Sequence, residues 1–371
     1  MVFSASSIHS LDTKGNAVAI VLRQLAFFII SIPLVVYLSQ RTLPQWRVLA
    51  RFGLLISAAI LIILQIPGVG KTVNGNTNWI ALPFVDVQPS EISKFLLILW
   101  ACYLLANHEK NGTTRINVFA LITPGFMVVI FLILLGRDLG TASVLMAILG
   151  GLLFVSGIPL RLVGTLTATA AVGIGFFIAT TQYRAARWSV FLNPFDPAQY
   201  KNEGWQPAHS LLGLASGGIF GVGLGGSRQK WGNLPEAHTD FVFSILAEEF
   251  GFVGILVVVT LFMVLSIRAL LLSRRAMVQG KKFHAYVACA FGLWIGVQSL
   301  VNMGVAMGVL PTKGLTLPLL SYGRSSLLMT LIWVCIVLRI YHEVVGLQRT
   351  VTRGPLAMSS APGAPPAEVA A

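Results

Sequence analysis

Nine blocks of apolar residues follow one another along this chain of 371 residues, and each is long enough to cross a lipid bilayer. A transmembrane helix needs about 20 predominantly apolar residues. Hydrophobic residues make up 56% of the chain and charged residues only 11%, whereas soluble domains carry about 25% charged residues. The sequence therefore predicts an all-α polytopic transmembrane helix bundle, with spans at residues 17–39, 48–66, 84–106, 118–135, 139–158, 162–180, 251–272, 285–310 and 325–345.

Basic residues concentrate in alternate loops of this predicted bundle. Fourteen Lys and Arg residues lie in one set of loops, and five lie in the short loops and N-terminal segment of the other set. Cytoplasmic loops are enriched in Lys and Arg, so the first set is predicted to be cytoplasmic. The C-terminus is then inside, and a large loop over residues 183–240 is extracytoplasmic. Because the charges orient helices, the net charge of +13 does not indicate a nucleic-acid partner.

The two ends of the chain differ in character from the bundle. Nine helices with the C-terminus inside place the N-terminus outside, yet residues 1–16 contain no signal peptide. We therefore expect that a first transmembrane helix is missing and that the natural chain begins upstream with one more apolar segment. At the other end, residues 350–371 are rich in Pro and Ala, which predicts a disordered cytoplasmic tail after a membrane domain over residues 1–349.

Two glycine-containing segments superficially resemble nucleotide-binding motifs. Residues 67–72 end like a phosphate-binding loop, but the first glycine of that motif would fall at Gln65, and the segment follows a membrane helix instead of a strand. The glycines of residues 217–226 lack the βαβ context of a dinucleotide site. We expect neither a nucleotide nor an organic cofactor. The three cysteines lie inside apolar segments, so no disulfide framework is expected.

Ionisable residues gather at the end of the long outer loop, in Leu-Pro-Glu-Ala-His-Thr-Asp-Phe at residues 234–241. Ionisable side chains near the membrane are costly, and their usual explanation is functional. Together with Gln-Pro-Ser-Glu at 88–91, Asp-Leu-Gly-Thr at 138–141, Pro-Thr-Lys-Gly-Leu at 311–315 and Ser-Tyr-Gly at 321–323, this run resembles the SEDS family of FtsW/RodA/SpoVE glycosyltransferases. The resemblance covers residues 1–343. The residues of its motifs are more similar to the division branch, FtsW, than to the elongation branch, RodA.

The chain also departs from the family pattern. Arg324 stands where a glycine usually follows Ser-Tyr-Gly, and Arg137 where a proline usually precedes Asp-Leu-Gly-Thr. Asn78 precedes the tryptophan of the second outer loop, where the family often has Arg. Arg137 or Arg324 could supply a cation lost elsewhere or could be solvated loop charges, and the sequence leaves both interpretations open.

The resemblance implies a peptidoglycan glycosyltransferase that polymerises lipid II into glycan strands for septal wall synthesis, cell shape and cell division. Transfer would be inverting: a sugar hydroxyl attacks the anomeric carbon and undecaprenyl pyrophosphate leaves. A good leaving group needs cations but no protonating acid, so one carboxylate base suffices, unlike glycoside hydrolysis with two. Asp240 is the candidate base; its structural alternative is a helix N-cap.

Several further residues are candidates for substrate binding. The expected cations for the pyrophosphate are Arg184, Arg187, Lys230 and Lys313, with Lys94 deeper in the bundle. Glu91 lies three residues before Lys94 on one helical face, so an ion pair between them and a substrate contact are both open. His238 could help Asp240 hold a divalent cation, Mg²⁺ or Mn²⁺, although two ligands alone make no site.

Other polar residues have structural interpretations. Asp138 could hydrogen-bond loop backbone, and such residues as Glu248, Glu249, Gln298 and Asn302 more often hold helices together than react.

The family also implies partners and a location. The expected partners are a class B penicillin-binding transpeptidase, other divisome proteins and membrane lipid, in a bacterial inner membrane with the catalytic face extracytoplasmic. Two rivals remain: a lipid II flippase and a non-catalytic scaffold for a penicillin-binding protein. Transporters place polar residues near the midplane, whereas here they concentrate around Asp240 at the outer face.

Overall fold

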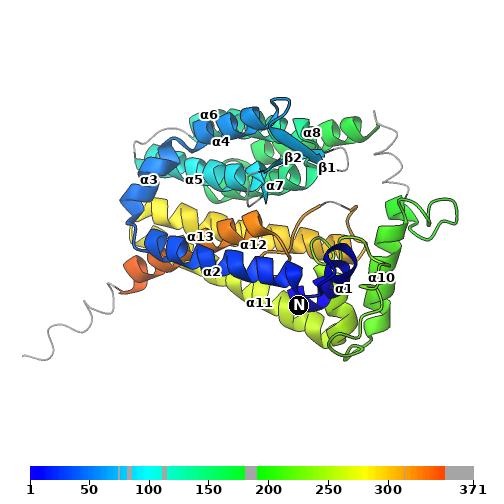
Figure 1. The fold of residues 1–371 in the computed structure, drawn as a ribbon. Helices are drawn as coiled ribbons and strands as arrows, with labels where there is room; N and C mark the ends of the chain where they lie inside the picture. The colour runs from blue at the N-terminus through cyan, green and yellow to red at the C-terminus, as the bar shows by residue number, and fades with distance from the viewer. Residues whose placement is uncertain (74–75, 82–85, 111–114, 180–189, 313, 347–371) are drawn as a thin grey trace, which may run out of the picture.

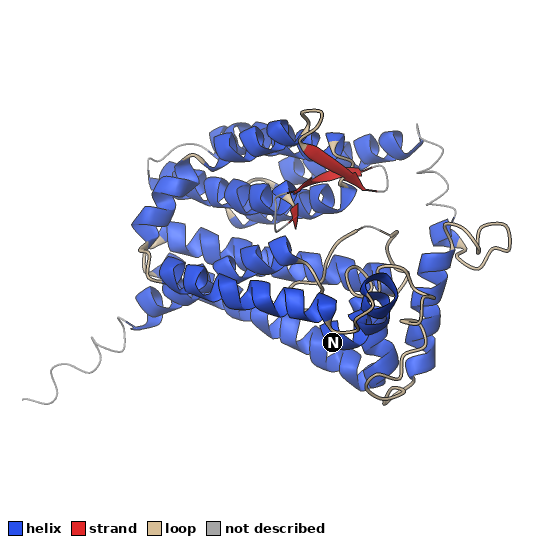
Figure 2. Ribbon diagram, in the orientation of Figure 1, coloured by secondary structure: helices blue, strands red, loops and turns tan. Residues whose placement is uncertain are grey.

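The computed structural model describes residues 1–73, 76–81, 86–110, 115–179, 190–312 and 314–346. These residues form helices almost throughout, with one small sheet (Figures 1 and 2). The helices are α1 (Val2–Lys14), α2 (Ala19–Ser39), α3 (Leu43–Arg51), α4 (Gly53–Leu64), α5 (Pro89–Lys110), α6 (Arg115–Leu135), α7 (Leu139–Val155), α8 (Leu160–Ala179), α10 (Trp205–Gly217), α11 (Val242–Val278), α12 (Lys282–Ala306), α13 (Arg324–Tyr341) and a π-helical turn, η1 (His342–Gly346).

Six of the described helices are long and apolar enough to span a membrane, and α3 and α4 together make a seventh, bent span. The all-α membrane bundle expected from the sequence is confirmed. α7 is apolar but shorter, at 17 residues, and α8 ends where the described range ends. The disordered tail expected at 350–371 lies outside the described residues.

Helices α5 and α12 form the centre of the bundle, and α2 and α11 lie at its outside. The span in α5 is 83% buried and that in α12 is 67% buried, against 11% for α2 and 17% for α11. α12 packs against α5, α7, α11 and α13 and so joins the two groups of helices seen in Figure 1. α1, α10 and the sheet lie toward one end of the bundle, called the outer end here, and α3 lies toward the other.

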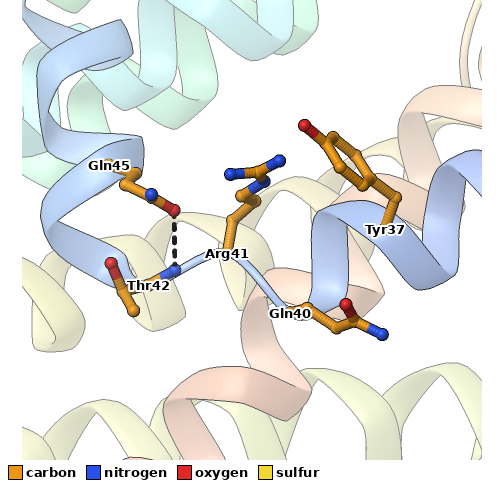
Figure 3. Close-up of a pocket in the computed structure, with 5 residues that line it drawn as sticks. All are labelled: Tyr37, Gln40, Arg41, Thr42 and Gln45. Atoms are coloured by element: carbon orange, nitrogen blue, oxygen red, sulfur yellow. Dashed lines mark hydrogen bonds between the residues drawn. The ribbon is translucent and has the colours of Figure 1, made fainter.

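The bent span corrects the sequence prediction of a single helix over 48–66. The helix begins earlier, at Leu43, and bends by 54° between α3 and α4. Thr42 caps α3 in a capping box, in which its backbone N–H donates to Gln45 Oε1 at 3.2 Å (Figure 3). The Arg41 guanidinium covers the Tyr37 ring at 4.0 Å and, with Gln40, lines a small pocket of about 280 Å³. Beyond the bend, a Cβ at Gly53 would lie 2.3 Å from Leu96 O, so glycine lets α4 pack closely on α5.

A three-stranded antiparallel sheet, absent from the sequence prediction, lies in the connection between α4 and α5. Its strands are β1 (Gly70–Val73), β2 (Asn76–Ala81) and β3 (Asp86–Val87), in the order β1-β2-β3. The register pairs Lys71 with Trp79 and Ile80 with Val87. Residues 67–72 therefore form a turn leading into β1, not a strand–loop–helix unit that could hold a nucleotide phosphate.

Helix α11 contains a break that the outer loop repairs. The sequence prediction placed its start at Gly251, but the helix begins at Val242, and Gly251 has a φ of 64° within it. The break frees backbone groups, and residues 218–223 satisfy them: Val222 N donates to Glu248 O at 2.9 Å, Gly223 N to Glu249 O at 3.1 Å, and Phe252 N to Gly218 O at 2.9 Å. Backbone groups near a bilayer must be paired within the protein, so this pairing fixes the loop to α11.

The break predicts that Gly251→Ala lowers the melting temperature of the detergent-solubilised protein. An alanine Cβ would lie 2.4 Å from Gly221 N and 2.5 Å from Ile219 O, and the positive φ disfavours any side chain. Backbone strain of this kind costs about 1–3 kcal/mol. Gly150→Ala, within helix α7 with nothing inside 4 Å of the added Cβ, is the matched control and should keep or raise the melting temperature. Equal melting temperatures for Gly251→Ala and the wild type would show that the break is not a fixed feature.

Candidate active site

The run at residues 234–241 forms a tight turn that ends at the start of α11. Glu236, with a φ of 55°, accepts hydrogen bonds at its carbonyl from the N–H groups of Thr239, Asp240 and Phe241, at 3.1–3.2 Å. The Thr239 hydroxyl also donates to Glu236 Oε2 at 2.6 Å. Three amides converging on one carbonyl fix the backbone on which Asp240 is carried.

Asn302 of α12 joins this turn to the segment before α13. Its Nδ2 donates to Asp240 O at 2.8 Å and to Leu315 O at 2.6 Å. Gly314 lies directly beside the aspartate, because a Cβ there would be 3.4 Å from Asp240 Oδ2. Two runs that are some 70 residues apart in the sequence, 234–241 and 311–315, therefore meet at the Asp240 carboxylate.

The environment of Asp240 disfavours its charged form. Burial, followed by the nearby carboxylates of Glu236 and Asp138, raises the pKa of Asp240 to about 7. The residue is half-buried, and within the described part of the chain no side chain donates a hydrogen bond to its carboxylate. A carboxylate with a pKa near 7 is well suited to accept a proton at neutral pH.

His238 is packed between two rings and shielded from solvent. It is 8% exposed, with its ring stacked on His9 of α1 at 4.9 Å and tilted against Tyr322 at 5.6 Å between centroids. Burial lowers the pKa of His238; the neighbouring Glu236 opposes that shift, and His9 adds to it. The neutral ring is therefore favoured at neutral pH.

The described residues do not fit a protein-bound metal. Among them no group of three or more His, Cys, Asp or Glu side chains comes together as a ligand set. The His238 ring packs against other rings, which leaves Asp240 as a single carboxylate ligand. Mg²⁺ takes about six oxygen ligands. We derive no step through a metal.

Two buried charged groups expected near the substrate instead hold helices together. Lys94 is almost fully buried and donates to Glu91 Oε1 at 2.8 Å and to Gln298 Oε1 at 2.9 Å, so the ion-pair alternative is the arrangement in this structure. Gln298 Oε1 also accepts from Trp294 Nε1 at 2.6 Å. The network ties α5 to α12 at the centre of the bundle.

Lys230, expected as a pyrophosphate ligand, is engaged in a buried network of the outer loop. Its ammonium donates to Glu249 Oε1 at 3.1 Å, Ser4 Oγ at 3.1 Å and Gly225 O at 2.7 Å. These three bonds use all three of its hydrogens, so its contacts give no support to a phosphate-binding role. Glu248 similarly holds the loop, accepting from Ser227 Oγ at 2.5 Å and from Arg228 N at 3.0 Å.

Asp138 is the N-cap of α7. Its carboxylate accepts from Thr141 N at 2.9 Å, Thr141 Oγ1 at 2.8 Å and Ser90 Oγ at 3.0 Å. This matches the structural role that the sequence allowed.

The remaining candidate cations divide between described and undescribed parts of the chain. Arg324 is the first residue of α13 and lies 3.8 Å from Asp86 Oδ2, to which Lys71 is also paired at 3.5 Å. Arg137 has a positive φ of 65° immediately before α7. Arg184, Arg187 and Lys313 lie outside the described residues. The sequence analysis missed His9, because nothing in its local sequence marks it as a neighbour of residue 238.

Comparisons with known proteins find relatives over nearly the whole chain. The profile of the FtsW/RodA/SpoVE family, described as cell cycle proteins, matches residues 1–345. A "probable peptidoglycan glycosyltransferase FtsW" from Thioalkalivibrio sulfidiphilus is 40% identical over 368 residues, which is 98% of this chain and 89% of the relative. The protein of the same name from Coxiella burnetii is 38% identical over 92% of each chain.

Solved structures show the same fold. A chain from a peptidoglycan synthase complex, described for the structural coordination of polymerization and crosslinking, matches with a TM-score of 0.73 and 28% identity over 92% of this chain and 95% of that chain. The rod shape determining protein RodA of Thermus thermophilus matches with a TM-score of 0.64 and 27% identity over 92% of this chain and 94% of that chain.

Fold and site together define a polytopic membrane protein with a half-buried carboxylate, Asp240, at the outer end of its bundle. The chain belongs to the FtsW/RodA/SpoVE family of cell cycle proteins. The family resemblance drawn from its sequence motifs is thereby confirmed.

The raised pKa predicts that Asp240→Asn stabilises the protein at high pH. The folded pKa of Asp240, about 7, lies above the ordinary 3.8, so the wild type loses stability as pH rises from about 4 through 7 while the amide does not. Melting temperatures in detergent should differ little at pH 4.5 and should favour the variant at pH 8. A difference that is the same at both pH values would contradict a raised pKa of Asp240 in the folded protein.

Proposed function

We propose that this chain is a peptidoglycan glycosyltransferase of the cell-division type, which polymerises lipid II into glycan strands with Asp240 as general base. One observation carries the proposal: a half-buried carboxylate with a pKa near 7 lies where the 234–241 turn meets the 311–315 segment. Its relatives bear the name probable peptidoglycan glycosyltransferase, and these two runs are the ones through which the sequence resembles the family.

The proposed chemistry uses this carboxylate for a single proton transfer. The sugar hydroxyl of one lipid II molecule forms a bond to the anomeric carbon of another from the face opposite the pyrophosphate. The bond from that carbon to the phosphate oxygen breaks, and its electron pair leaves with undecaprenyl pyrophosphate. The hydroxyl proton passes to Asp240. The configuration is inverted, and the leaving anion needs positive charge instead of an acid.

Cations near the outer end would bind the pyrophosphate. Arg184, Arg187 and Lys313 remain candidates from the sequence, and Arg324 is a candidate whose place the structure describes. Asp86 holds Arg324 only at 3.8 Å and shares its charge with Lys71, so the guanidinium keeps donors for a phosphate. Lys94 and Lys230 are not assigned this role, because their donors are used internally.

The setting of the enzyme follows from the same resemblance. We propose a multi-pass protein of the bacterial inner membrane with Asp240 on the extracytoplasmic side, as the distribution of Lys and Arg indicates. A related chain was solved as part of a complex that coordinates polymerization and crosslinking. We propose a class B penicillin-binding transpeptidase as the partner of this chain, with divisome proteins and membrane lipid around it. A divalent cation, Mg²⁺ or Mn²⁺, would have to reach the site with the substrate diphosphate.

The transporter alternative fits the structure less well. A flippase requires polar groups that face a path through the bilayer. The polar side chains deep in the bundle, Glu91, Lys94 and Gln298, bond to one another and are at most 3% exposed. Asp240, which lacks a described donor, lies instead at the outer end of the bundle.

The first functional prediction is that Asp240→Asn abolishes lipid II polymerisation by the purified protein with its partner. The amide keeps the shape of the carboxylate but cannot accept the proton, and a positioned base contributes about 10²–10⁴-fold. Labelled glycan strands resolved on a gel provide the measurement. Asp12→Asn, an exposed carboxylate of α1, is the matched control and should polymerise normally. If Asp240→Asn synthesises glycan strands at near the wild-type rate, Asp240 is not the base and has only a structural role.

The second functional prediction concerns Arg324. If its guanidinium binds the pyrophosphate, Arg324→Ala should raise the KM for lipid II several-fold, because part of this contact exists before the transition state. Lys71→Ala removes the other cation paired with Asp86 and should leave KM near the wild-type value. Equal KM values for both variants and the wild type would show that Arg324 pairs with Asp86 and does not bind the pyrophosphate.

A further inference from the structure

Three aromatic rings from distant parts of the chain form a stack at the outer end. The His9 ring lies on His238 at 4.9 Å with 25° between the planes, and Tyr322 lies against His238 at 5.6 Å. The three rings come from α1, from the turn that carries Asp240, and from the segment before α13. His238 thus contacts the rings of two residues that are remote from it in sequence.

Helix α1 is fixed in place independently of this stack. The Ser4 hydroxyl donates to Glu249 of α11 and accepts from Lys230 at 3.1 Å. At the other end of α1, Ser10 Oγ accepts from Ile20 N at 3.2 Å and donates to Asn16 O at 2.5 Å. His9 itself is exposed, whereas His238 beneath it is 8% exposed. The His9 ring therefore covers a buried ring and is presented by a helix that is anchored on its buried side.

The stack acts on the backbone that carries Asp240. His238 lies two residues before Asp240, and its carbonyl accepts a hydrogen bond from Tyr322 N at 2.9 Å. The other side of the turn is held by Asn302, which donates to Asp240 O. Removing the His9 ring would expose His238 to water and take away one of the two ring contacts that hold its side chain.

We propose that His9 is a positioning residue for the glycosyl transfer: its ring covers His238 and thereby fixes the turn that presents Asp240. It acts through His238 and does not touch the reacting atoms. The requirement is for a flat ring at position 9, not for its proton. The proposal rests on the proposed function only for its kinetic consequence, since the covering of His238 is a property of the protein alone.

Three variants separate this role from a general effect on folding. His9→Ala removes the ring, His9→Phe keeps a ring of similar size without its nitrogens, and Asp12→Ala changes an exposed residue of the same helix. In lipid II polymerisation with the partner present, His9→Ala should lower kcat by about 2- to 10-fold, the range that an aromatic stacking contact corresponds to. KM should stay within about 2-fold, because the substrate contacts are unchanged. His9→Phe should recover most of the lost kcat, and Asp12→Ala should match the wild type.

A second measurement does not depend on activity. Diethyl pyrocarbonate modifies accessible neutral imidazoles, and the tryptic peptide after Lys230, ending at Arg268, contains His238 as its only histidine. Mass spectrometry of this peptide should show slow labelling in the wild type and in His9→Phe, and faster labelling in His9→Ala.

Each outcome decides the proposal. Unchanged labelling and unchanged kcat in His9→Ala would overturn it, and so would a His9→Phe variant as impaired as His9→Ala. Faster labelling with an unchanged kcat would show that the cover exists but does not position the base, which also overturns it. If the wild type forms no glycan strands, the proposed function fails, while the labelling still tests whether His9 covers His238.

Discussion

Inside a bilayer every polar group must find its partner within the protein, and the centre of this bundle meets that constraint through one lysine. Lys94 on α5 bonds to Glu91 on its own helix and to Gln298 on α12, which in turn accepts from Trp294. α5 and α12 are the most buried of the candidate spans, so this network lies where an unpaired charge would cost most. Helices of both groups pack against α12, so α12 sets how the two groups lie relative to each other.

At the outer end the buried carboxylates are likewise bonded within the protein. Glu248 and Glu249 are buried and bonded to the loop over 216–230, and Asp138 caps α7. Asp240 alone among these carboxylates is left without a described donor, while Asn302 and the Glu236 carbonyl hold its backbone. The protein thus fixes the position of this residue and leaves its oxygens available. The raised pKa is the electrostatic consequence, and it gives the carboxylate the basicity that a proton acceptor needs.

Properties set by local composition could be predicted from the sequence. Apolar blocks gave the spans of α2, α5, α6, α12 and α13 to within a few residues, and the outer-loop run marked Asp240. The bend at Phe52, the sheet and the early start of α11 could not be predicted, because each depends on contacts with another segment. Gly251 looked like a helix start, and only the pairing of residues 218–223 with α11 allows the helix to continue through it.

The contacts of Lys230 could not be predicted for the same reason. A lysine in an outer loop is expected from the sequence to be an available cation. Its partners Ser4 and Glu249 lie 226 and 19 residues away, so local sequence does not indicate that it is paired. His9 was missed for the matching reason, since its ring meets His238 only after the bundle has formed. Long-range pairing decided which charges are available for substrate and which are already used.

If Asp240 is the general base, the reaction should depend on a group that titrates near neutrality. The most direct test is the pH dependence of kcat/KM for lipid II polymerisation by the wild-type protein with its partner, because its acid limb reports the pKa of the essential base in the free enzyme. We expect activity to fall as pH decreases through about 7, following the pKa of Asp240. An acid limb near pH 4, the range of an ordinary exposed aspartate, would contradict this account.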